Sequence, residues 1–292
     1  MSEFLQSSYS GLLYGSVYGL MALGLTVIWG AMRLLNLAHG ALYLVGGYVA
    51  WTVVNRLSMP LTLAVPVAVA GAAVAGLLMY GLFIRPLVGR PGWDSATLIA
   101  TVGVGIAIEA AALLVFGPQV KDFPSILDGS FTVERVLILH QGLLVIGVAA
   151  VSLFAMNAYL RVSRRGMAIR AVSQDVQAAS LMGIPIDATF AFVIAISAGL
   201  AGLAGVLLSS TFYLSPTSGF NPMILAVVVT ILGGLGSIKG TVVAAYSIGL
   251  IESFVNVYAG SSWGLPVLFS TMIIVLTVRP NGLFGVGEVR RL

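Results

Sequence analysis

The sequence contains no cysteine. A disulfide framework, a zinc site built on thiolates and a thiol nucleophile are therefore excluded. Charge is also scarce, because only 8% of the 292 residues are charged, whereas 59% are hydrophobic and the mean hydropathy is +1.06. Soluble domains contain about 25% charged residues. The composition therefore predicts an all-α, polytopic integral membrane protein with a single transmembrane domain over residues 1–292.

Long apolar runs dominate the sequence. A membrane-crossing helix needs about 20 apolar residues, because its backbone polar groups must be satisfied within the segment. We predict eight to nine such helices. The second run follows the first with hardly room for a turn, and the seventh is short, so both are candidates for broken or re-entrant helices. The candidate spans are 9–31, 34–54, 60–84, 95–116, 136–160, 188–212, 222–236, 241–258 and 265–279.

The Lys and Arg residues indicate the orientation of the chain, because cytoplasmic loops accumulate them. If the loop 161–187 is cytoplasmic, eleven of the fourteen lie inside, and only Arg56, Lys121 and Arg135 lie outside. This predicts an external N-terminus, a cytoplasmic C-terminus and an external loop at 117–135. The basic residues form no patch with interleaved aromatics, so nucleic-acid binding is not expected.

The loop 161–187 contains the signals of a short helix. Ser173 can cap it, Asp175 lies in the first turn, where the helix dipole favours a negative charge, and Gly183 can end it. A helix of about nine residues is marginal alone. It either rests on the membrane surface or its own bundle, or docks into a partner. Helical spacing predicts one apolar face, made by Val172, Val176, Ala179 and Met182.

Polar groups inside apolar runs are candidate functional residues, because they are costly to bury in a membrane. Glu109 and Glu252 are candidates for lining or gating a substrate route, or for pairing within the bundle. Asn36 and His39 are predicted to hydrogen-bond backbone groups at a helix break near that route. The only other histidine, His140, is predicted at the opposite face, so no metal site is expected.

The segment GGLGSIKGT combines glycines with a lysine and a threonine. A phosphate-binding loop requires glycine, then lysine, then serine or threonine, whereas Lys239 is followed by glycine and no strand precedes it. The segment therefore predicts a turn between two spans. No matched nucleophile, base and orienting group is found, so the chain is not expected to be an enzyme. The turn residues are Gly233, Gly234, Gly236, Ser237 and Gly240.

Small residues recur four positions apart in two of the apolar runs. Such pairs let membrane helices approach closely. Packing within one bundle is the favoured interpretation, and contact with another subunit is the alternative. The pairs are Gly71 and Ala75, Ala72 and Gly76, Ala198 and Gly202, and Ala201 and Gly205.

Four motifs give the sequence a family resemblance. QAASLMG is similar to the cytoplasmic motif of ABC importer permeases, with Gln177 where that motif has glutamate. NLAHGALYLVGGYVA (36–50), GGLGSIKG (233–240) and RPNGLFG (279–285) narrow the match. Together they resemble the branched-chain amino acid ABC transporter permease family, specifically the smaller of its two permease subunits. The resemblance extends from about residue 9 to 286 of the chain.

The resemblance implies a transport subunit in the cytoplasmic (inner) membrane of a prokaryote. Its implied partners are a homologous second permease, two cytoplasmic ATPases that carry ATP-Mg, and an external solute-binding protein, with no cofactor on this chain. A permease for urea or short-chain amides, and a self-sufficient secondary transporter or channel, are the alternatives. The resemblance implies an ATPase-coupling helix made by Ser173, Gln174, Asp175, Val176, Gln177, Ala178, Ala179, Met182 and Gly183.

Overall fold

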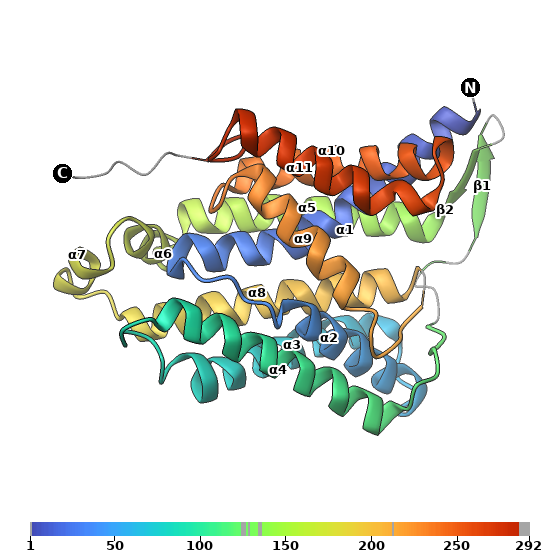
Figure 1. Cartoon of the computed structure of the whole chain (residues 1–292). Coiled ribbons are helices and arrows are strands. Elements are labelled where there is room, and N and C mark those ends of the chain that lie inside the picture. Colours follow the sequence, from blue (N-terminus) through green and yellow to red (C-terminus); the bar gives the residue numbers. More distant parts are fainter. Residues whose placement is uncertain (1, 124–126, 128, 134–135, 212, 286–292) are drawn as a thin grey trace.

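The computed structural model describes residues 2–123, 127, 129–133, 136–211 and 213–285. Within these residues the chain forms a helical bundle with one small β-hairpin (Figure 1). The helices are α1 Ser2–Met32, α2 His39–Asn55, α3 Leu61–Met79, α4 Trp93–Phe116, α5 His140–Val162, α6 Arg164–Gln174, α7 Val176–Leu181, α8 Ile186–Ser209, α9 Phe220–Gly233, α10 Ile238–Tyr258 and α11 Gly264–Val278. A π-helical turn, Tyr80–Ile84, continues α3, and a 3-10 turn, Ser261–Trp263, precedes α11.

Seven segments of the described chain are long and apolar enough to cross a membrane. The other two predicted spans are shorter, because α2 has 17 residues and α9 has 14. The run predicted to start at 34 becomes helical only at His39, and residues 33–38 are non-helical. Both helices are therefore short, and the second run is interrupted at its start, whereas α9 is one continuous helix.

The loop predicted at 117–135 contains a strand that the sequence analysis did not anticipate. Strand β1 (Ser130–Val133) pairs in antiparallel register with β2 (Val136–Leu139), with Ser130 opposite Leu139. The fifth span accordingly begins at His140 rather than at 136. The side-chain amide of Gln6 donates to the carbonyl of Leu137 and accepts from its N–H, at 3.4 and 3.0 Å. The hairpin is thereby fixed to α1.

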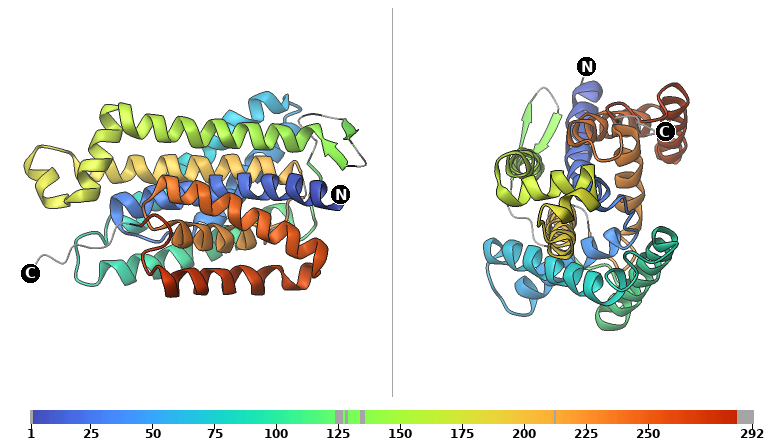
Figure 2. Two further views of the ribbon diagram at one scale, coloured as in Figure 1. Left: turned by 90° about the horizontal axis from the view of Figure 1, so that it is seen from above. Right: turned by 90° about the vertical axis from the view of Figure 1, so that its left-hand side faces the viewer.

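Helix α1 is the centre of the bundle. Its most apolar stretch is 89% buried, whereas that of the segment ending in α11 is 11% buried. Helices α3 and α4 lie along one side, and α10 and α11 lie along the opposite side (Figure 2). The exposed faces of these outer helices are apolar, as expected for surfaces that contact lipid.

The predicted small-residue pairs bring α3 and α8 together. A Cβ on Gly76 would lie 2.5 Å from the Cβ of Ala198, and a Cβ on Gly202 would lie 2.5 Å from that of Ala72. Neither position has room for a larger side chain, because such distances are well below van der Waals contact. These two pairs pack within one bundle, as predicted.

The start of α1 and the β-hairpin lie at one end of the bundle, whereas α7 and the end of α11 lie at the other (Figure 1). The loop 161–187 and the C-terminal side of α11 therefore share one end of the molecule, which agrees with the relative placement that the Lys and Arg residues predict.

Candidate functional site

Three capping residues shape the loop between α5 and α8. The hydroxyl of Ser163 accepts a hydrogen bond from the N–H of Gly166 at 2.9 Å and starts α6. Asp175 is extended, at φ −158° and ψ 113°, and breaks the helix. Its carboxylate accepts from the N–H of Ala178 at 2.9 Å and starts α7. Gly183, at φ +79°, ends the turn that follows α7, as predicted.

The predicted cap at Ser173 is wrong. Ser173 lies in the last turn of α6, where its hydroxyl donates to the carbonyl of Arg170 at 2.7 Å. Gln174 is the last residue of α6 rather than part of the next helix. Burial of Ile169 and Val172, at 5% and 1% exposure, explains the difference, because their packing holds this segment helical up to Gln174.

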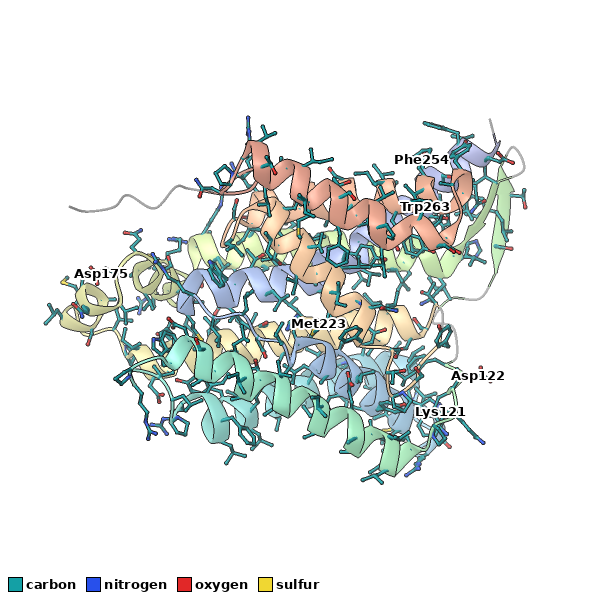
Figure 3. The ribbon with its side chains drawn as sticks, viewed as in Figure 1. Lys121, Asp122, Asp175, Met223, Phe254 and Trp263 are labelled. Atoms are coloured by element: carbon teal, nitrogen blue, oxygen red, sulfur yellow. The ribbon has the colours of Figure 1, made fainter. Side chains whose placement is uncertain are left out.

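The single apolar face predicted from Val172 to Met182 does not form, because the break at Asp175 changes the helical phase. Val172 and Ala179 are buried. The other two, Val176 and Met182, are exposed together with Leu181 at the end of the bundle that carries α7 (Figure 3 labels the neighbouring Asp175). We call this group the α7 tip, and it consists of Val176, Leu181 and Met182, which are 42%, 89% and 83% exposed.

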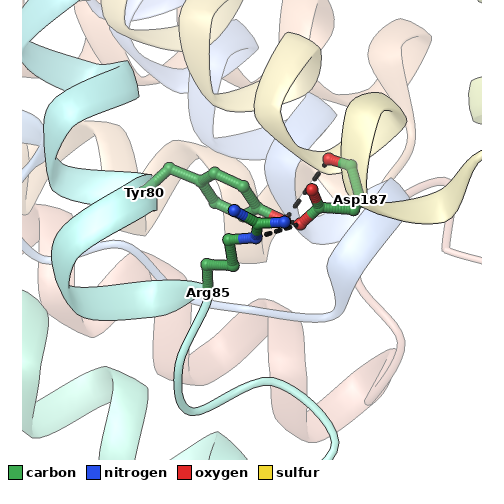
Figure 4. Close-up of polar contacts among 3 residues, drawn as sticks. All are labelled: Tyr80, Arg85 and Asp187. Atoms are coloured by element: carbon green, nitrogen blue, oxygen red, sulfur yellow. Dashed lines mark hydrogen bonds and ion pairs between the residues drawn. The ribbon is translucent and has the colours of Figure 1, made fainter.

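A polar contact joins the start of α8 to the end of α3 (Figure 4). The hydroxyl of Tyr80 donates to the carboxylate of Asp187 at 2.8 Å, and the Arg85 guanidinium lies 3.1 Å from the same oxygen. The sequence analysis did not single out Tyr80 or Asp187. Each is an unremarkable residue at the end of an apolar run, and only the folded chain brings them together.

Helix α2 begins close to mid-membrane depth. A Cβ on Gly24 of α1 would lie 2.7 Å from His39 Cε1 and 2.9 Å from Ser197 Oγ. Gly24 precedes the end of α1 by eight residues, and Ser197 follows the start of α8 by eleven. At 1.5 Å per residue these offsets are about 12 and 16 Å. Both are near the middle of a hydrocarbon layer about 30 Å thick.

Helix α9 begins beside the start of α2. The backbones of Gly40 and Gly219 are in contact, and Gly219 is the residue that precedes α9. Met223, which Figure 3 labels, is half-buried in the first turn of α9. Neither helix has a side-chain cap at its N-terminus. The N-terminus of α2, which has a partial positive charge, is therefore buried, and the N-terminus of α9 lies beside it with Phe220 exposed.

Several polar groups at the start of α2 have no hydrogen-bond partner in the described part of the chain. They are Asn36 Nδ2, His39 Nδ1 and Ser197 Oγ, and all three side chains are fully buried. The other ring nitrogen of His39 contacts the carbonyl of Met21 at 3.0 Å, and Asn36 Oδ1 accepts from the N–H of Ala38 at 3.0 Å. The predicted backbone contacts of Asn36 and His39 are thus confirmed. We call Asn36, His39 and Ser197 the central polar cluster.

Ser197 was not singled out from the sequence, although a signal was present. It is the polar residue nearest the centre of the apolar run 188–212. Buried polar groups without a partner are rare, because each costs about 1–3 kcal/mol. Three such groups lie around the uncapped N-terminus of α2.

Glu109 and Glu252 are not brought together. Glu109 is on α4 and Glu252 is on α10, and these helices run along opposite sides of the bundle (Figure 1). Each lies in the half of its helix that is nearer the N-terminal end of the bundle. Glu252 hydrogen-bonds to the side chain of Tyr18. Its Oε2 is buried without a partner among the described residues.

The glycine-rich segment between α9 and α10 is a tight turn, as predicted. Gly234 and Gly236 have φ of +100° and +83°, which favours glycine. The Ser237 hydroxyl accepts from the N–H of Gly240 at 3.2 Å and caps α10. The backbones of Gly233 and Gly240 are in contact. The segment follows a helix rather than a strand, so it lacks the context of a phosphate-binding loop.

Comparison with known proteins gives matches over nearly the whole chain. The sequence model of the branched-chain amino acid transport system permease component matches residues 8–277. The chain is 32% identical to the high-affinity branched-chain amino acid transport system permease protein LivH of Escherichia coli, over 99% of this chain and 98% of that protein. It is 31% identical to BraD, the corresponding protein of Pseudomonas aeruginosa, with the same coverage. A probable LivH of Methanocaldococcus jannaschii is 30% identical over 94% of this chain and 90% of that protein.

Proposed function

Because the chain belongs to the branched-chain amino acid transport permease family, we propose that it is the smaller permease subunit of an ABC importer that moves branched-chain amino acids across the cytoplasmic membrane. A homologous second permease completes the pathway. Two cytoplasmic ATPases bind and hydrolyse ATP-Mg, and an external solute-binding protein delivers the substrate. The N-terminus lies outside and the C-terminus lies in the cytoplasm.

The α7 tip is the observation that best supports this proposal. Leu181 and Met182 are almost fully exposed, at 89% and 83%, while caps at Ser163 and Asp175 hold the helices beneath them. Burying one such side chain in a partner's groove contributes about 1.5–3 kcal/mol. The tip is therefore a rigid, apolar projection that can bind in a groove of an ATPase subunit.

Helix α8 connects the tip to the centre of the bundle. Its start is held by Asp187, which binds Tyr80 and Arg85 at the end of the α3 segment. Farther along, Ser197 faces His39 and Gly24. A displacement of α7 by the ATPase would therefore move α8 and, through it, the start of α2. Movement of such a group of helices would give alternating access.

Single substitutions at the α7 tip test the coupling role. We expect Leu181→Glu and Met182→Glu each to reduce co-purification of the ATPase subunits about tenfold, because a charge in an apolar groove cancels the gain of roughly 1.5–3 kcal/mol. Met167→Glu is the matched control, since Met167 is 49% exposed on α6 outside the tip. Retention of the ATPases by both tip variants, measured on the purified complex, would contradict the coupling role.

The central polar cluster offers what a zwitterionic amino acid needs. The Asn36 amide, the Ser197 hydroxyl and the uncapped N-terminus of α2 supply donors for a carboxylate. The His39 nitrogen that faces the Met21 carbonyl must be the donor in that contact, so Nδ1 is left as an acceptor for a substrate ammonium. All three side chains are buried in this conformation, so the cluster opens only when α8 or α9 moves.

Asn36→Asp tests this substrate contact. It keeps the shape of the side chain but replaces a donor by a negative charge, which would repel the substrate carboxylate. We expect uptake of leucine by the complete transporter to fall about tenfold or more, since a hydrogen bond to a charged group is worth roughly 1.5–3 kcal/mol. Asn55→Asp, at the exposed end of α2, is the control. Unchanged uptake with Asn36→Asp would show that the cluster does not contact the substrate. Loss of ATPase co-purification would instead indicate a folding defect.

A further inference from the structure

A basic pocket lies at the end of the bundle that carries α7. It has a volume of about 290 Å³ and is lined by residues of α1, α5, α6 and α10. Arg161 comes from the last turn of α5, Arg170 from α6 and Lys239 from the first turn of α10. Asn157, Ser173 and Ser237 add polar groups, and none of the lining residues is acidic. In the described part of the chain, none of the three cations has a carboxylate partner.

An apolar groove of about 510 Å³ continues from this pocket. The two share Asn157, Ile238 and Lys239. The groove is lined from the α5 side by Leu153 and Phe154, and from the α10 side by Val243 and Tyr246. Leu153 lies eight residues from Arg161, and Tyr246 lies seven from Lys239. At 1.5 Å per residue, the groove descends about 10–12 Å from the charges into the membrane-spanning part of both helices.

We propose that the pocket and the groove together bind one anionic phospholipid, with the phosphate of its headgroup among Arg161, Arg170 and Lys239 and an acyl chain in the groove between α5 and α10. Basic pockets between transmembrane helices are suited to anionic headgroups, and each nearby cation contributes about 1 kcal/mol. A second copy of the chain, or another apolar helix, would fill the groove but would leave three cations without a counter-charge. A single anionic lipid accounts for both the charge of the pocket and the apolar lining of the groove.

Such a lipid would link the coupling loop to the bundle. Arg170 and Ser173 belong to α6, which leads directly into α7, whereas Arg161 and Lys239 belong to the transmembrane helices α5 and α10. The headgroup would therefore bridge α6 to both. This site is separate from the α7 tip and from the central polar cluster, so it does not depend on the proposed substrate.

Lipid binding can be measured on the purified full-length chain by native mass spectrometry. Phosphatidylglycerol and phosphatidylcholine with identical acyl chains are the probes, and we expect phosphatidylglycerol to bind preferentially. The double variant Arg161→Gln plus Lys239→Gln should weaken this binding about 30-fold, because each of the two lost cations contributes about 1 kcal/mol. Arg170 is left unchanged because its guanidinium also donates to the carbonyl of Leu160.

Two further variants distinguish a lipid bound at this site from general surface attraction and from a second protein chain in the groove. The control Arg90→Gln plus Arg164→Gln removes the same charge from exposed positions outside the pocket, and it should leave the preference intact. Val243→Trp fills the groove without changing charge, and it should weaken binding of phosphatidylglycerol. Equal losses in the two double variants would mean general surface attraction and overturn the proposal. So would displacement of the lipid by free glycerol phosphate at equal concentration, or a Val243→Trp variant that changes self-association while lipid binding persists.

Discussion

Gly24 has no side chain, and the packing at the centre of the bundle depends on this. An added Cβ would lie 2.7 Å from the ring of His39 and 2.9 Å from the hydroxyl of Ser197. We therefore expect Gly24→Ala to destabilise the protein by about 1–3 kcal/mol, as overpacking does. The measurement is the thermal unfolding midpoint in detergent. Gly103→Ala on α4, where a Cβ would meet no atom within 4 Å, is the control, and an equal loss in both variants would contradict the argument.

The contact at Asp187 contains two interactions of different character. Tyr80 is buried, at 4% exposure, so Tyr80→Phe should lower the free energy of unfolding by about 1 kcal/mol at any salt concentration. Arg85 and Asp187 are 63% and 54% exposed, so Arg85→Gln should cost less than about 1 kcal/mol and lose its effect in high salt. Chemical unfolding at low and high salt measures both. A salt-dependent Tyr80→Phe effect would show that the hydroxyl acts only through the ion pair.

At the scale of single residues, the sequence predicts what a residue can do better than where its partner is. Asn36 and His39 could be expected to bond the backbone at a helix break, because both are polar groups in an apolar run. Ser197 belongs to the same cluster but lies on α8, far away in the sequence, and Gly24 of α1 leaves room for the contact between Ser197 and His39. Ser197 is recognisable as a polar residue within an apolar run, but its position beside His39 follows only from the packing of the helices.

The choice of helix cap is decided at the scale of the element. Ser173 and Asp175 are both good caps by residue type, and only the burial of Ile169 and Val172 determines that α6 continues through Ser173. We expect Asp175→Ala to destabilise α7 by about 1 kcal/mol. Ser173→Ala should have little effect. Hydrogen exchange of the α7 amides measures both effects. A larger effect of Ser173→Ala than of Asp175→Ala would show that Ser173 caps α7, as the sequence suggested.

The two short helices mark the limit of what apolar runs predict. The pattern of apolar runs identified the second span by its tight junction with the first and the seventh by its length, and both are short in the structure, at 17 and 14 residues. It could not reveal that α2 and α9 begin beside one another, because this depends on the close approach of Gly40 and Gly219. Irregular backbone at membrane depth is tolerated where protein surrounds it, and residues 34–38 before α2 are buried or half-buried.

At the scale of the whole molecule, charge and hydropathy predicted the arrangement well, because both act on long segments. The bundle has α1 at its centre and apolar helices outside, and it separates the N-terminal end from the end that carries α7. The pairing of β1 with β2 was missed, since β1 is a short strand in a polar loop and β2 is an apolar segment that runs directly into the fifth span.

The absence of cysteine makes the orientation directly testable, because any introduced thiol is the only one in the chain. Ser130 on β1 and Gln177 on α7 are exposed at opposite ends of the bundle. If the excess of Lys and Arg near α7 sets the topology, a membrane-impermeant maleimide should label Ser130→Cys in intact cells and Gln177→Cys only after the membrane is opened. Labelling of Gln177→Cys in intact cells would show that the chain has the opposite orientation. The α7 tip would then lie outside, where a cytoplasmic ATPase cannot reach it.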